Sequence, residues 1–280
     1  MDRVEAITEV MAATEVSPEV QVVQTRFRVG LVDQWRIPAG ASVLEVGCGQ
    51  GDMTAVLAEA VGERGRVVGV DIAEPTYGAP VTLGESAEFL RSTPLGARVD
   101  IRFGFDVLDE ANSFAADTFD YVVLSHCSWY FASVDQLTRT LARVRPWARH
   151  LCFAEWDLRP NALSQLPHLL AVLIQGQVEA TGERATGNIR SPFSQQSLLR
   201  ALTPAGWRTT AQHPVDAGSL QDADWEIGYC LRPSGVVTRL PTLPEPMREF
   251  VTSQLDVLRA VALERGNDPL PSYLVTADRR

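Results

Sequence analysis

The chain of 280 residues carries 25 basic and 35 acidic side chains, which gives a formal net charge of −10 at pH 7. A surface of this sign repels polyanions, and the sequence has no run of arginines, so we expect no nucleic-acid partner. The hydrophobic share of 45% suffices for a buried core, yet no apolar run approaches the ~18 residues of a membrane span. Because the first 16 residues also lack the apolar stretch of a signal peptide, we expect a soluble, cytoplasmic protein without a membrane partner.

The four cysteines, Cys48, Cys127, Cys152 and Cys230, lie far apart in the sequence and form no C-x-x-C pair. Such spacing favours neither a zinc site nor a disulfide framework. We therefore expect buried free thiols and no bound metal.

Apolar periodicity predicts the elements in chain order. Two leading helices are expected over 2–16 and 19–35, and short apolar runs then alternate with helical segments. The expected strands of this part are 42–46, 66–70, 99–103, 119–124 and 150–154. The expected helices between them are 52–61, 82–92 and 135–144. This alternation is typical of an α/β protein with a doubly wound, mostly parallel sheet, whose strand carboxyl ends meet at one ligand-binding edge.

The regular alternation stops after Glu155. We expect helices over 163–179, 194–202 and 246–265, and strands over 207–213 and 273–277, the last one antiparallel. Seven strands result, and the chain divides into N-terminal helices that act as a lid (1–37), a ligand-binding core (38–156), cap insertions (157–193 and 220–265) and segments that complete the sheet (194–219 and 266–280). The polar loop of the first insertion holds Arg184 and Arg190, for which a solvated lid and recognition of a substrate carboxylate both stay open.

Three glycines follow the first expected strand in the run VLEVGCGQGDMT, at Gly47, Gly49 and Gly51. Glycine at such positions lets the backbone approach a ligand and allows positive φ angles. A dinucleotide fingerprint has a glycine where this chain has Asp52, which we expect to cap the next helix and to disfavour a pyrophosphate. The missing glycine therefore argues against an NAD-dependent oxidoreductase.

Asp71 ends the second expected strand, 20 residues after Gly51. This separation brings a carboxylate over the ribose of a nucleoside ligand. Together with Glu45 and Asp52, it makes the surroundings of the glycine loop acidic. A nucleoside that carries positive charge suits this loop better than a phosphate-bearing one.

With these motifs, the segment from about Val43 to Ala154 resembles the class I S-adenosylmethionine-dependent methyltransferases, which have a Rossmann-like, seven-stranded fold. The family's loop wraps the methionine end of the cofactor, an acid after the second strand binds the ribose, and an aspartate after the third strand contacts the adenine. The end of the fourth-strand motif, here FDYVVLSHCSWYF, passes beneath the transferred methyl group. The resemblance implies cofactor contacts at Glu45, Gly47, Gly49, Gly51, Asp71, Ile72, Asp106, Val107 and Ser125.

Two residues at the same sheet edge are candidates for catalysis. His126 follows the fourth strand, where a general base would lie next to the sulfonium, although a purely structural hydrogen-bonding role stays open. Glu155 follows the fifth strand and faces the same edge. The run from His126 to Trp129 replaces the N-P-P-Y tetrad of many amino-group methyltransferases, which argues against nucleobase or amide side-chain acceptors. Aromatic residues that could line a substrate pocket, or else pack in the core, are Trp129, Tyr130 and Trp156.

The sequence therefore predicts S-adenosylmethionine-dependent methyl transfer to a small-molecule acceptor, with oxygen or nitrogen favoured over carbon. An acidic surface without a basic groove, together with a sizeable helical cap, favours an enclosed pocket. The alternative is a protein of the same fold that binds the cofactor but regulates, or catalyses a cyclisation, without methylating. The sequence does not indicate an oligomeric state.

Overall fold

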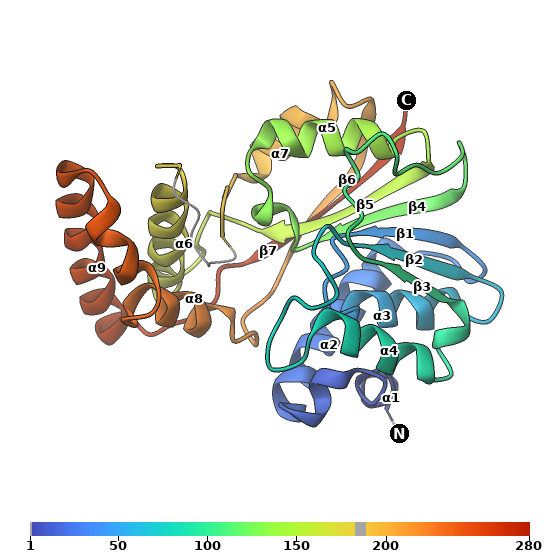
Figure 1. Ribbon diagram of the computed structural model, residues 1–280, viewed down its shortest axis with the longest axis horizontal. Helices are drawn as coiled ribbons and strands as arrows, with labels where there is room; N and C mark the ends of the chain where they lie inside the picture. The colour runs from blue at the N-terminus through green and yellow to red at the C-terminus, as the bar shows by residue number, and fades with distance from the viewer. Residues whose placement is uncertain (1, 183–188) are drawn as a thin grey trace.

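The computed structural model describes residues 2–182 and 189–280. In this described part, seven strands form one sheet in the order β3-β2-β1-β4-β5-β7-β6 (Figure 1). β7 runs antiparallel to both of its neighbours, whereas the pairs from β3 to β5 are parallel, as predicted. The strands are β1 (Ser42–Val46), β2 (Arg66–Val70), β3 (Val99–Arg102), β4 (Phe119–Ser125), β5 (Ala148–Trp156), β6 (Trp207–Val215) and β7 (Ser272–Arg279).

Helices cover both faces of the sheet. On one face lie α2 (Pro18–Trp35), α3 (Asp52–Val61) and α4 (Leu83–Ser92), and on the other lie α5 (Val134–Val144) and α7 (Gln195–Leu202) (Figure 1). The two apolar layers are separate clusters, because alternate residues of each buried strand point to opposite faces. Side-chain caps begin several helices: Thr82 accepts a hydrogen bond from the Glu85 amide, and Ser194 accepts one from the Ser197 amide.

The prediction of one helix over residues 2–16 is wrong. α1 (Arg3–Thr8) is followed by a separate 3-10 helix, η1 (Ala12–Glu15). Met11, between them, has an extended backbone and buries its side chain, where its sulfur accepts a hydrogen bond from Gln21 of α2 at 2.8 Å. Burial of this methionine against α2 thus interrupts the helix.

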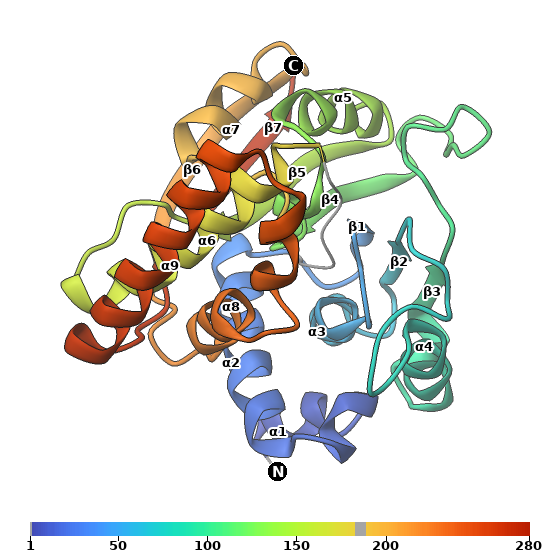
Figure 2. The ribbon, with the colours of Figure 1, turned by 60° about the vertical axis from the view of Figure 1, so that its left-hand side comes forward.

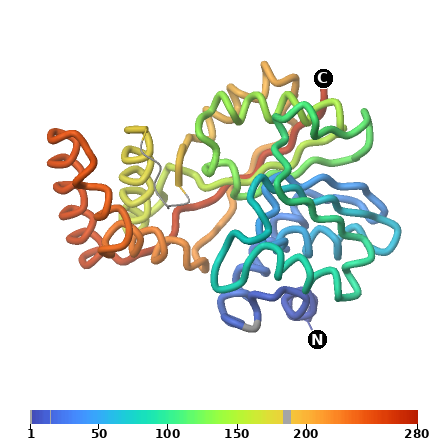
Figure 3. The backbone as a smooth tube through the Cα atoms, in the orientation of Figure 1, coloured from blue at the N-terminus to red at the C-terminus, as the bar shows by residue number. Residues whose placement is uncertain are grey.

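Three further helices pack together beyond the end of the sheet where β5 terminates. They are α6 (Leu166–Glu179), preceded by η4 (Leu163–Gln165), α8 (Asp222–Leu231) and α9 (Glu245–Arg265), with η5 (Val236–Thr242) between the last two. They share an apolar cluster of their own. Figure 3 shows that the chain leaves the sheet twice. After β5 it forms α6 and returns for α7 and β6, and after β6 it forms α8 and α9 and returns as β7. We call α6, α8 and α9 the cap.

Two further findings concern the chain as a whole. No described helix is both long enough and apolar enough to cross a membrane. All four cysteines are buried free thiols, as predicted.

Candidate functional site

The three loop glycines all have positive φ angles, but the space around them differs. A Cβ at Gly47 would lie 2.6 Å from the Cβ of Cys127, so the loop packs directly against the end of β4. At Gly49, whose φ is +51°, an added Cβ would meet no atom within 4 Å. Packing therefore requires glycine at 47, whereas the open backbone at 49 is free to meet a ligand.

Asp71, directly after β2, holds this open backbone in place. Its Oδ2 accepts a hydrogen bond from the Gly49 amide at 2.8 Å, and its Oδ1 accepts one from the Ala73 amide at 2.9 Å. Each carboxylate oxygen has a second acceptor position, so two hydroxyl donors can still bind. Ile72 next to it is 62% exposed, which leaves an apolar surface beside the carboxylate.

Asp52 does not cap α3, which corrects the expectation from the sequence. Gly51, in the left-handed conformation, is the N-cap residue, and Asp52 is the first residue of the helix. Its carboxylate instead accepts a hydrogen bond from Gln21 at 3.1 Å and lies 3.4 Å from the guanidinium of Arg28. The acid thus ties the glycine loop to α2.

Arg28 is a residue that the sequence reasoning missed. Its Nη1 is buried and has no hydrogen-bond partner among the described residues, although Nη2 faces Asp52. The guanidinium lies beside Asp52 at the start of α3, and the neighbouring Phe27 of α2 contacts His126 after β4. A partly buried guanidinium with an unpaired donor suits a carboxylate ligand.

Glu45 lies beneath the glycine loop and is 2% exposed. Thr54 of α3 donates a hydrogen bond to its carboxyl group. Burial raises the pKa of Glu45 to about 8, so that the group is mostly protonated at pH 7. A contact between Glu45 and a cofactor stays a prediction.

Asp106 and Val107 lie in the turn after β3. Asp106 Oδ1 accepts a hydrogen bond from the Leu108 amide at 2.8 Å, which is an Asx turn, and Val107 is 6% exposed. The turn geometry explains an aspartate at this position without a ligand. Their contacts to an adenine therefore stay predictions.

His126 directly follows β4 and has a φ of +49°. Ser272 donates its hydroxyl proton to the Glu155 carbonyl at 2.8 Å, so its oxygen can only accept from His126 Nε2, 3.0 Å away. The proton of the neutral ring is thereby assigned to Nε2, and Nδ1, 3.3 Å from the Ser125 hydroxyl, keeps its lone pair. Burial and then the charge of Arg28 lower the pKa of His126 to about 3, so the ring is neutral at physiological pH.

Aromatic rings surround this imidazole. Phe27 of α2 and Trp156 at the end of β5 contact it edge-on, with centroid distances of 5.4 Å and 5.2 Å. Trp156 in turn contacts His168 of α6 at 5.4 Å, which connects the sheet edge to the cap. His126 is thus fixed by packing as well as by hydrogen bonds.

The two other aromatic candidates differ from each other. Trp129 is 2% exposed and belongs to the core cluster on the α5 face, whereas Tyr130 is 45% exposed. Desolvation, followed by the charge of Glu226, nevertheless raises the pKa of Tyr130. A pocket role for Trp129, Tyr130 and Trp156 stays a prediction.

Glu155, the other catalytic candidate, is 1% exposed. Its Oε2 accepts hydrogen bonds from the Ser128 hydroxyl at 2.6 Å and the Ser128 amide at 3.2 Å, and Oε1 accepts one from the Trp156 amide. Burial raises its pKa to about 7. Glu155 therefore fixes the turn that follows His126.

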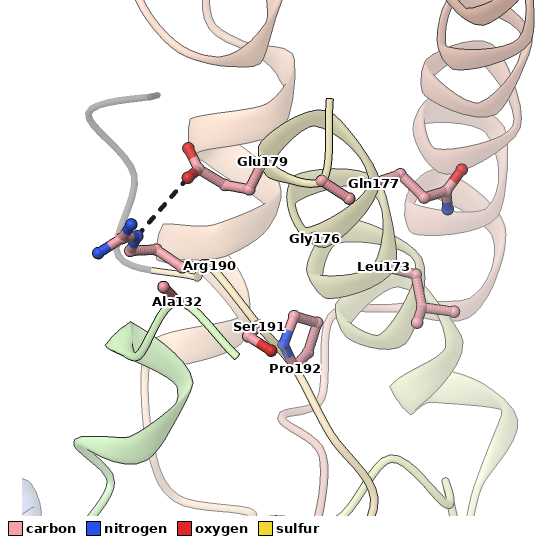
Figure 4. A pocket seen from close by; sticks show the side chains of 9 residues that line it. Ala132, Leu173, Gly176, Gln177, Glu179, Arg190, Ser191 and Pro192 are labelled. Atoms are coloured by element: carbon pink, nitrogen blue, oxygen red, sulfur yellow. Dashed lines mark ion pairs between the residues drawn. The ribbon is translucent and has the colours of Figure 1, made fainter. Parts of the chain in front are cut away.

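A separate pocket of about 380 Å³ lies between α6 and the segment 190–192. Figure 4 shows Glu179 and Arg190 facing each other across it, with 3.7 Å between their charged atoms. Arg190 thus pairs with an acid of the cap, and Arg184 lies outside the described residues. The pocket adjoins the cap and does not include the glycine loop.

Known proteins resemble large parts of this chain. Residues 25–212 match the model of a family described as a methyltransferase domain. The methyltransferase phomM′ of Diaporthe leptostromiformis is 28% identical over 220 residues, which cover 62% of this chain and 55% of that protein. The nocamycin O-methyltransferase of Saccharothrix syringae is 40% identical over 111 residues, which cover 39% and 36%. The chain thus spans about half the length of the first of these relatives, and less of the second.

A solved structure resembles the chain from end to end. A cyclopropane-fatty-acyl-phospholipid synthase-like protein from Lactobacillus casei ATCC 334 is 34% identical, with a TM-score of 0.88. The match covers 99% of this chain and 98% of that one, so it includes the cap as well as the sheet.

Proposed function

The chain belongs to the S-adenosylmethionine-dependent methyltransferases, and we propose that it transfers the methyl group of this cofactor to a small-molecule acceptor. The observation that carries the proposal is the open backbone of Gly49, held by Asp71 in a loop whose Gly47 packs against the end of β4. Two relatives carry the name of methyltransferases, and the name of one specifies an oxygen acceptor. An oxygen or nitrogen acceptor is therefore our first choice.

The residues around the loop fit the cofactor. Asp71 offers free acceptor positions for the ribose hydroxyls, and the exposed Ile72 offers a surface for the adenine. The unpaired Nη1 of Arg28 suits the methionine carboxylate, whose recognition the sequence left open. When bound, S-adenosylmethionine supplies an activated methyl group for in-line displacement.

Within this proposal the chain's own residues act by positioning and by proton handling. The lone pair of His126 Nδ1, which the Ser125 hydroxyl approaches at 3.3 Å, accepts a hydrogen bond from the acceptor nucleophile in place of Ser125 and draws its proton away as the bond to carbon forms. Its low proton affinity makes this a modest contribution, so orientation and exclusion of water provide most of the rate. Glu155 acts through Ser128, as the positioning residue of the turn after His126.

The test uses S-adenosylmethionine labelled in its methyl group and a panel of phenols, alcohols, carboxylic acids and amines. The wild type should label at least one acceptor, and His126→Gln should lose roughly tenfold or more in rate while its affinity for S-adenosylhomocysteine stays unchanged. His150→Gln is the matched control, because His150 is partly exposed at the far end of β5. Tight cofactor binding without labelling of any acceptor would instead support the non-methylating alternative.

One observation supports a carbon acceptor as the second candidate. The match to the Lactobacillus casei structure extends over both the sheet and the cap, and that protein's name likens it to a cyclopropane synthase. Unsaturated lipids dispersed in detergent therefore belong in the acceptor panel. Mass increase on an alkene, with no product from phenols or amines, would favour this candidate.

A further inference from the structure

The cap helix α8 brings two carboxylates toward the core. Asp222 and Glu226 are four residues apart and therefore lie on the same face of the helix. Gln24 of α2 donates a hydrogen bond to Asp222 at 2.9 Å, and Gln175 of α6 donates one to Glu226 at 2.6 Å. Figure 2 shows α8 lying between α2 and the rest of the cap.

The side-chain carbonyl of Gln175 is a buried acceptor beside Glu226 that lacks a donor in the described part of the chain. Gln175 is 2% exposed, and its Oε1 has no hydrogen-bond partner among the described residues although its amide nitrogen is bound to Glu226. Leaving a buried carbonyl unpaired is unfavourable, so a ligand that supplies a donor is favoured there. This carbonyl is a separate observation from the two carboxylates, and it favours the same kind of ligand, one that carries hydrogen-bond donors.

Positive charge is scarce at this face. Neither Asp222 nor Glu226 makes an ion pair within residues 2–182 and 189–280. Two arginines contribute positive charge here, Arg28 toward Asp222 and Arg232 toward Glu226. Arg28 is paired with Asp52, and Arg232 lies over the Tyr229 ring at 5.2 Å, so in the described structure neither forms a salt bridge with the two acids. Two partly buried carboxylates without an ion pair favour a ligand that brings a cation.

The face also adjoins the end of β4. Gln24 precedes Phe27 and Arg28 on α2, and Phe27 contacts the ring of His126. Tyr130 lies four residues after His126. Its pKa is raised by desolvation and then by the negative charge of Glu226, with a smaller effect of Asp222. A molecule that reaches His126 thus has α8 as a neighbouring wall.

We propose that Asp222 and Glu226, with the Gln175 carbonyl, bind a protonated amine of the methyl acceptor. This inference rests on the proposed function and adds the substrate class to it: the acceptor is a small molecule that carries an ammonium group. Asp222 and Glu226 select the substrate, while the glycine loop, Asp71 and Arg28 bind the cofactor. The two sets of residues can therefore be tested separately.

The experiment measures binding by calorimetry to the protein saturated with S-adenosylhomocysteine. Three pairs of probes differ only by the amine: tyramine and 4-ethylphenol, benzylamine and benzyl alcohol, tryptamine and 3-ethylindole. At least one amine should bind about tenfold or more tightly than its neutral counterpart, as one charge-assisted hydrogen bond provides. Preference for the amine in none of the three pairs overturns the inference.

Variants then locate the site. Glu226→Gln and Asp222→Asn should each reduce the amine preference to about threefold or less, with unchanged affinity for S-adenosylhomocysteine. Asp224→Asn is the matched control, because Asp224 is exposed on the same helix and accepts a hydrogen bond from Asn267. An amine preference that survives both substitutions would place the ammonium group elsewhere. Failure of S-adenosylhomocysteine to bind the wild type would instead contradict the proposed function.

Discussion

The amide of Gly49 donates a hydrogen bond to the carboxylate of Asp71 across 2.8 Å, and this contact joins the loop after β1 to the end of β2. The same carboxylate that is proposed to bind the ribose thus also fixes the backbone that meets the ligand. Because both tasks depend on one side chain, loop geometry and cofactor affinity should fail together.

Replacing Asp71 with alanine should weaken the binding of S-adenosylhomocysteine by about 10- to 1000-fold. Each charge-assisted hydrogen bond to the carboxylate contributes roughly 1.5–3 kcal/mol, and the loop also loses its support. Isothermal titration calorimetry measures this directly. Asp100→Ala on β3, where the carboxylate is half-exposed beside Arg102, is the control and should bind as the wild type does. Equal affinities in the two variants would contradict the role of Asp71.

Alanine at Gly47 and at Gly49 should have different consequences. Both positions have positive φ, which costs an alanine about 1–2 kcal/mol. Gly47→Ala adds the clash with Cys127 and should lose about 1–3 kcal/mol more in unfolding free energy, as urea denaturation would show. Gly49→Ala should remain the more stable of the two and instead lose affinity for S-adenosylhomocysteine. The reverse order of stabilities would show that the close approach at Gly47 does not limit the fold.

The alternation of strands and helices, the antiparallel last strand and the glycine loop could all be predicted, because each has a local signature in the sequence. α8 could not be identified in this way. Asp222, Asp224 and Glu226 alternate with apolar residues and Gly228 interrupts the helical pattern, so only packing of Ala223 and Ile227 in the cap makes the segment a helix.

The chemistry of the site depended on distances that no local pattern contains. Arg28 becomes a candidate ligand-binding residue only because α2 packs beside the loop after β1. Asp52 likewise binds side chains of α2 instead of capping its own helix. Burial likewise determines that Glu45 is mostly protonated at pH 7, whereas the sequence shows only an acid near a glycine loop.

The pH dependence of stability tests the environment of Glu45. Its pKa is about 8 in the folded protein and 4.5 ordinarily, so between these values the folded state holds the proton more tightly. The contribution of Glu45 to stability is present below pH 4.5 and is lost as pH rises toward 8. Between pH 5 and 8 the wild type should therefore lose up to about 1.4 kcal/mol per pH unit relative to Glu45→Gln. Urea denaturation at four pH values measures this difference.

The corresponding control for that series is Glu88→Gln, since Glu88 is exposed on α4. The free energies of this variant and the wild type should differ by a constant amount over the same range. A constant difference for Glu45→Gln as well would mean that the carboxyl group is ionised in the folded protein at pH 7.

Ser272 should control the tautomer of His126. In Ser272→Ala the Nε2 proton loses its acceptor, so methyl transfer should fall roughly tenfold while affinity for S-adenosylhomocysteine stays unchanged. Ser272→Thr keeps a hydroxyl and should restore the rate. Long-range proton–nitrogen NMR spectra of the imidazole should show the Nε2–H form in the wild type and a mixture of tautomers in Ser272→Ala. A single Nε2–H form in the alanine variant would show that another group sets the tautomer.

The burial of all four thiols has a practical consequence for chemical labelling. The chain also contains no lysine, so no lysine amine competes for a thiol reagent. Burial raises the pKa of each of these cysteines, so maleimide and iodoacetamide reagents should leave the native protein unlabelled. Cysteines introduced at the exposed positions Glu88 of α4 and Glu249 of α9 would then carry the two dyes alone. Energy transfer between them would report in solution whether the distance between the cap and the sheet changes as ligands bind.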